Sequence, residues 1–172
     1  MPRRAPLLLP LPLLLLSLLA GLAAAHPSRP DCAGPSGGHG PAAAGSGGFA
    51  LSGPAEGVAA GATAPLTLRG PVPFRGFLVV PTDAAHGGAF VPPLGSGTRL
   101  ACGGVGHSSP ALKDAATLTW RAPDAFTGAA TFSYYVLVSA GEWCGPLSAS
   151  VAVHGGGGAK NATSAAAAPV KG

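Results

Sequence analysis

Charged and aromatic side chains are scarce in this sequence of 172 residues, and the scarcity excludes several classes of protein. Asp, Glu, Lys and Arg make up 9% of the chain and aromatic residues 6%. Beyond the first two dozen residues there is no cluster of basic side chains, so nucleic acid or acidic lipid is not indicated as a partner. No later segment is long and apolar enough to span a bilayer.

Motifs for catalysis and metal binding are also lacking. The chain has no Cys-x-x-Cys and no His-x-His, and its five histidines have no zinc-site spacing. Glu56 and Glu142 are isolated acids, which gives no basis for a glycosidase pair. We therefore predict no catalytic residues and no cofactor.

The amino terminus has the three parts of a cleavable secretory signal peptide. Arg3 and Arg4 precede a leucine-rich run, and Ala23-Ala24-Ala25 supplies the small residues that a signal peptidase needs. A retained membrane anchor is the rival interpretation, but the uninterrupted apolar run is short and contains prolines. We predict a signal peptide over 1–25, cleavage before His26, no membrane insertion afterwards and a secreted, extracellular product.

Glycine and proline are abundant in the remainder, and they punctuate short runs of β-branched and aromatic residues. Such punctuation is typical of an all-β domain. The runs lie at residues 49–52, 66–69, 74–80, 89–91, 98–102, 115–120, 129–139 and 147–153. We therefore expect an antiparallel β-sandwich of seven to eight strands.

Alternation within two of these runs predicts the side chains of the core. Ala116, Leu118 and Trp120 share one face of the first run. In the second run the apolar face holds Phe132, Tyr134 and their alternating neighbours Ala130, Val136 and Val138. Phe77 and Val79 come from a continuous apolar run, which favours a strand buried on both faces.

The two ends of the mature chain lack such patterns. Residues 26–48 read as an extended arm that Cys32 could tie down. Residues 154–172 read as a disordered tail rich in Gly and Ala. Within that tail, Asn161-Ala162-Thr163 is a sequon for N-glycosylation.

Several landmarks in order resemble the reeler domain, the N-terminal module of reelin and the spondins and the whole of some insect defence proteins. They begin with Cys32 and His39-Gly40 and continue with Phe74-Arg75-Gly76-Phe77, Cys102 and Gly106-His107-Ser108. They end with Leu118-Thr119-Trp120-Arg121-Ala122-Pro123 and Ala130-Thr131-Phe132. The resemblance covers residues 26–153 and implies an immunoglobulin-like sandwich.

Three cysteines follow the leader, so an exported chain should form one disulfide and leave one thiol over. Chain entropy does not choose between the three pairings. The resemblance pairs Cys32 with Cys102, and a covalent tie would order an arm that has few apolar side chains. Cys144, in an expected Gly-Pro turn, is then half of a lost second bridge, either free or able to link two chains in a dimer.

Two residues are candidates for binding. Trp143 lies in an expected Gly-Glu-Trp-Cys-Gly turn and is the aromatic most suited to contact a ligand. His26, if it becomes the mature N-terminus, could chelate copper through its ring and its α-amine.

The sequence thus favours a secreted, non-enzymatic reeler-type protein that binds an extracellular protein or glycan at the cell surface, in matrix or in defence. A secreted copper protein that uses His26 is one alternative. The other is a fragment of a larger protein, since the resemblance extends to reeler domains fused to DOMON and b-type cytochrome regions of membrane reductases.

Overall fold

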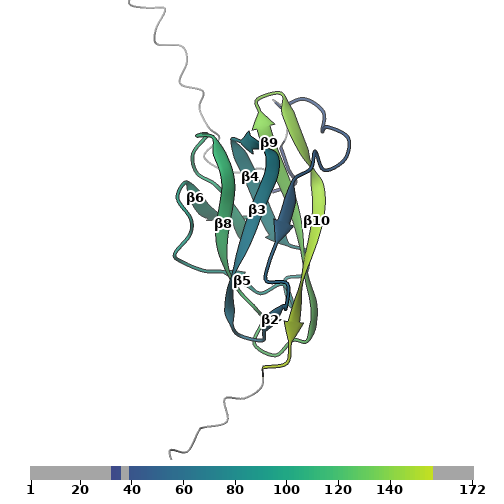
Figure 1. Ribbon diagram of the computed structural model, residues 1–172, viewed down its shortest axis with the longest axis vertical. Coiled ribbons are helices and arrows are strands. Elements are labelled where there is room, and N and C mark those ends of the chain that lie inside the picture. Colours follow the sequence, from purple (N-terminus) through teal and green to yellow (C-terminus); the bar gives the residue numbers. More distant parts are fainter. Residues whose placement is uncertain (1–31, 36–38, 157–172) are drawn as a thin grey trace, which may run out of the picture.

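Two β-sheets packed face to face make up the part of the chain that the computed structural model describes, residues 32–35 and 39–156 (Figure 1). The strands in chain order are β1 (Ala50–Ser52), β2 (Val58–Ala59), β3 (Thr63–Phe74), β4 (Gly76–Pro81), β5 (Ala89–Phe90), β6 (Thr98–Ala101), β7 (Gly104–His107), β8 (Lys113–Arg121), β9 (Gly128–Ser139) and β10 (Glu142–His154). This architecture confirms the predicted all-β sandwich.

In each sheet the longest strands lie between shorter strands at the edges. One sheet runs β1-β3-β8-β5 and the other runs β2-β10-β9-β4-β7-β6. Every named pair is antiparallel except β2 with β10, which is parallel. The β9–β10 hairpin is the most extensively paired element, and its turn carries part of the candidate site described below.

The core lies between the sheets and is apolar, as the alternation predicts. Leu118 and Trp120 of β8 face Phe132 and Val136 of β9, and all four are fully buried. The rings of Trp120 and Phe132 meet edge to face with centroids 5.4 Å apart. The indole N–H of Trp120 donates to the carbonyl of Gly87 at 2.8 Å, which satisfies the one polar group that this side chain brings into the core.

The described residues form ten strands, where the sequence predicted seven to eight. The two additional strands, β2 and β7, are a two-residue strand and a Gly-Val-Gly-His segment, and neither has an apolar run long enough to signal a strand. The expected strand over 74–80 was wrong in its start, because Arg75 separates the end of β3 from the start of β4. Pro71 and Pro73 do not end β3 but lie in a bulge, where the register shifts between Arg69 and Phe74.

The leader over 1–25 and the tail beyond residue 156 fall outside the described residues. His154, which was expected to begin the tail, is the last residue of β10. Within the described part of the chain, no helix is long and apolar enough to cross a membrane.

Candidate functional site at the arm

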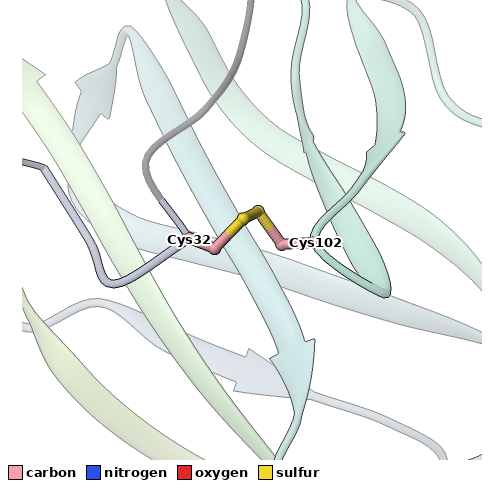
Figure 2. The surroundings of a disulfide bond; sticks show 2 residues. All are labelled: Cys32 and Cys102. Carbon is pink, nitrogen blue, oxygen red and sulfur yellow. A yellow bond between two sulfur atoms is a disulfide. The ribbon is translucent and has the colours of Figure 1, made fainter.

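A disulfide joins Cys32 to Cys102, the pairing that the resemblance implied (Figure 2). The two Cα atoms are 5.5 Å apart. Cys102 is not at a strand end, because Cys102 and Gly103 form the two-residue turn between β6 and β7. Both have positive φ, 57° and 74°, as a hairpin turn of this length favours. The bond therefore ties the chain's amino-terminal part to a rigid hairpin turn.

The described residues before β1, namely 32–35 and 39–48, are called the arm here. The arm lies against the turn end of the β9–β10 hairpin. Ala43 forms a parallel bridge with Cys144, and its N–H donates to the carbonyl of Trp143 at 2.7 Å. In return the indole N–H of Trp143 donates to the carbonyl of Gly40 at 2.9 Å. His39 bonds the carbonyl of Ala140 through Nδ1 at 3.0 Å.

Two glycines let the arm approach this closely. A Cβ at Gly34 would lie 2.6 Å from the ring of Tyr135, and a Cβ at Gly47 would lie 2.8 Å from Sγ of Cys144. Gly47 also has φ of +57°, where most side chains are strained. The Gly-rich composition of the arm therefore reflects contact with the sheet rather than a lack of structure.

Cys144 is a free thiol that is 2% exposed. Its expected place in a turn was wrong, because it lies within β10 opposite Val136, and the hairpin turn falls earlier, at Ala140 and Gly141. Burial, and secondarily the charge of Glu142, raises the pKa of the Cys144 thiol. A buried thiol held in its neutral form reacts slowly, so Cys144 would have to become exposed before it could link two chains.

Trp143 also belongs to β10 rather than to a turn, and it is half-buried. Its ring packs against that of Tyr135, with centroids 6.1 Å apart. Because its N–H is bonded to the arm, Trp143 has a structural role and presents only part of its ring. The aromatic pair Tyr135–Trp143 and the adjoining backbone of the arm form a surface suited to binding an apolar or sugar face.

Two of the described histidines, His86 and His154, bond groups away from this surface. His86 bonds Asp83 at 2.7 Å, and this hydrogen bond is the main reason why the pKa of that carboxyl is lowered. His154 bonds the carbonyl of Glu56 at the opposite end. In the described ranges no three His, Cys, Asp or Glu side chains are grouped to hold a metal ion. His26 and Asn161 lie outside those ranges.

Comparison with known proteins agrees with the β-sandwich fold. The family model described as the Reeler domain matches residues 31–154, which include every strand of the structure. The human F-spondin reeler domain (fragment 1) is 21% identical, with a TM-score of 0.55 over 67% of this chain and 95% of its own. The Reelin-N domain of F-spondin is 20% identical, with a TM-score of 0.51 over 67% and 93%. Among curated proteins none matches the chain.

Proposed function

The chain belongs to the reeler domain family, and from this membership we propose that it is a secreted, non-enzymatic module that binds an extracellular protein or glycan. The observation that carries the proposal is the family match over residues 31–154, which takes in the whole sandwich. The leader-like residues 1–25 and a disulfide between Cys32 and Cys102 support export, because disulfides persist in oxidising compartments.

The surface at the arm supports binding rather than chemistry. It offers the partly exposed rings of Tyr135 and Trp143 beside the backbone of the arm, to which Trp143 is bonded. Its nucleophile, Cys144, is buried and held neutral. Aromatic rings beside backbone hydrogen-bonding groups are the usual means of holding a neutral polar ligand such as a sugar.

A binding screen of the protein recovered from culture medium tests the proposal. Matrix glycans, microbial surfaces and cell-surface proteins serve as probes, and mass spectrometry of the same sample identifies the mature N-terminus. Trp143→Ala should weaken any binding found, because it removes the exposed part of the aromatic pair and one tie to the arm.

Phe126→Ala is the matched control. Phe126 is also half-buried and also packs against another ring, that of His86, but it lies at the opposite end of the sandwich. The proposed site is wrong if the two substitutions reduce binding equally or if Trp143→Ala leaves it unchanged. Protein retained in the cell with residues 1–25 intact would contradict export.

A further inference from the structure

Two short segments at one end of the sandwich expose apolar side chains together. They are Pro71-Val72-Pro73 and Pro110-Ala111-Leu112, and all six residues are exposed. Val72 is 46% and Leu112 59% exposed, and in the described residues only Leu100 on β6 is a comparable large apolar side chain. The six residues are called the apolar tip below.

The fold, not the sequence, brings the two segments to one place. Phe74 pairs with Lys113, so the end of β3 and the start of β8 lie side by side. Between Arg69 and Phe74 the chain bulges, and four residues of β3 oppose only Asp114 of β8. Val72 lies within this bulge, and Leu112 directly precedes β8.

Two basic side chains fix the segments to each other. The ammonium of Lys113 donates to the carbonyls of Arg75, Ser109 and Ala111 at 3.0, 2.7 and 2.7 Å. The guanidinium of Arg75 donates to the carbonyl of Pro110 at 3.3 Å. The loop before β8 is thereby bound to the corner between β3 and β4, and the apolar tip is a defined surface.

Several backbone groups of the apolar tip either are paired within the protein or are missing because the residue is proline. Its three prolines have no N–H, and the N–H of Ala111 donates to Oγ of Ser109 at 3.2 Å. The carbonyls of Pro110 and Ala111 are bonded to Arg75 and Lys113. An unpaired backbone group is destabilising in contact with lipid, so this arrangement favours a bilayer as the partner. A protein groove would supply hydrogen bonds itself and would not need the backbone of the apolar tip to be paired in advance.

The charged residues at the end of the sandwich that carries the apolar tip favour an anionic bilayer. Arg69 and Arg75 are exposed beside the apolar tip, although the sequence contains no basic run. The acids Asp114 and Glu142 lie at the same end, which leaves a small positive balance once Lys113 is counted. The opposite end carries three described acids, Glu56, Asp83 and Asp124, against the single guanidinium of Arg121. An anionic surface therefore attracts the end with the apolar tip.

We propose that the apolar tip docks into the interfacial layer of an anionic phospholipid bilayer. Val72 and Leu112 enter the boundary between headgroups and acyl chains, and Arg69 and Arg75 contact lipid phosphates. This peripheral contact goes beyond the proposed function, because it uses side chains other than the Tyr135–Trp143 pair and involves no spanning segment.

Sedimentation with vesicles of phosphatidylcholine, with and without phosphatidylglycerol, tests the proposal on the protein recovered from medium. Binding is expected to the anionic vesicles and to fall with added salt. The double substitution Val72→Ser/Leu112→Ser should reduce the partition coefficient roughly tenfold or more. Arg69→Gln should reduce it about fivefold on anionic vesicles and leave neutral ones unaffected.

Leu100→Ser is the matched control, because Leu100 is 56% exposed but lies on the edge strand β6. It should bind vesicles as the parent protein does. The proposal is overturned if the parent protein does not bind anionic vesicles, or if Leu100→Ser loses as much binding as the double variant. Near-ultraviolet dichroism of each variant confirms that the sandwich is intact. The effect of Trp143→Ala on vesicle binding, expected to be nil, separates this proposal from the proposed function.

Discussion

The two tryptophans mark two regions that are held together by different means. Trp120 is fully buried between the sheets and packs against Phe132. Trp143 is half-buried, packs its ring against Tyr135 and holds the arm through two hydrogen bonds, one to the carbonyl of Gly40 and one from the N–H of Ala43. The core thus depends on apolar area, which many side chains share, whereas the arm depends on a disulfide and a few backbone hydrogen bonds. Damage to the core should spread through the molecule, and damage to the arm should stay local.

Truncation of Trp120 should have the largest effect. Trp120→Ala removes a fully buried ring and leaves a cavity beside Phe132, and we expect a loss of roughly 3–5 kcal/mol in the free energy of unfolding. Trp143→Ala should cost roughly 1–2 kcal/mol, because its ring is partly solvated. Urea unfolding followed by far-ultraviolet dichroism measures both. Equal losses would show that the arm region is as integral to the fold as the core.

Removal of the disulfide tests the contrast between core and arm by a change in the arm. Cys32→Ser should lower the free energy of unfolding by about 2–4 kcal/mol, since the bond closes a long loop in the unfolded chain. Hydrogen exchange should quicken at Ala43, whose N–H bonds the carbonyl of Trp143, through local opening of the arm, whereas the core strands β8 and β9 should quicken only by the factor that the lower free energy of unfolding accounts for. Cys102→Ser is the partner control and should give the same pattern. An increase at β8 and β9 beyond that factor would contradict a local role.

The sequence predicted the core better than the arm, for a physical reason. Alternation identifies Leu118, Trp120 and Phe132 because burial between sheets imposes a period of two on a strand. The arm carries no such period, because its contacts use backbone groups and glycines. Many segments rich in small residues have the same composition, so the sequence of the arm does not reveal these contacts. The disulfide pairing came from the family resemblance. The apolar tip was not predictable, because its two segments are far apart in the chain and meet only through the β3–β8 pairing.

A second, engineered disulfide tests the contrast between core and arm further, because it fixes the arm to β10 at another point. A Cβ at Gly47 would lie 2.8 Å from Sγ of Cys144, close to the separation of about 3 Å between Cβ and the partner Sγ in a disulfide. We expect Gly47→Cys to pair with Cys144 and to raise the free energy of unfolding by about 1–2 kcal/mol, less than a full disulfide because a positive φ is strained.

Titration of free thiols and non-reduced peptide mapping check this pairing. The variant should have no free thiol after unfolding, whereas the parent protein should have one. Gly45→Cys is the control, because a Cβ there would meet nothing within 4 Å. A bridge formed equally well from position 45 would mean that the arm moves freely over Cys144.

The smallest expected effect is a dependence of stability on alkaline pH that originates at Cys144. Burial raises the pKa of its thiol above the ordinary value of 9.0, so the unfolded chain releases this proton at lower pH than the folded protein does. The contribution of the neutral thiol to the free energy of unfolding is therefore fully present below pH 9.0. It is lost as the pH rises through the higher pKa of the folded protein.

Cys144→Ala should flatten the decline of the unfolding free energy with pH just above pH 9.0, whatever the effect of the substitution at neutral pH. Tyr134, whose pKa burial raises from 10.0, adds a decline of the same sign at higher pH, and Tyr134→Phe removes it. Lys113 acts with the opposite sign, because burial lowers its pKa from 10.5 and the unfolded chain then binds the proton more readily. Urea unfolding at closely spaced pH values distinguishes the three. An unchanged slope in Cys144→Ala would mean that the arm does not shield the thiol from water in solution.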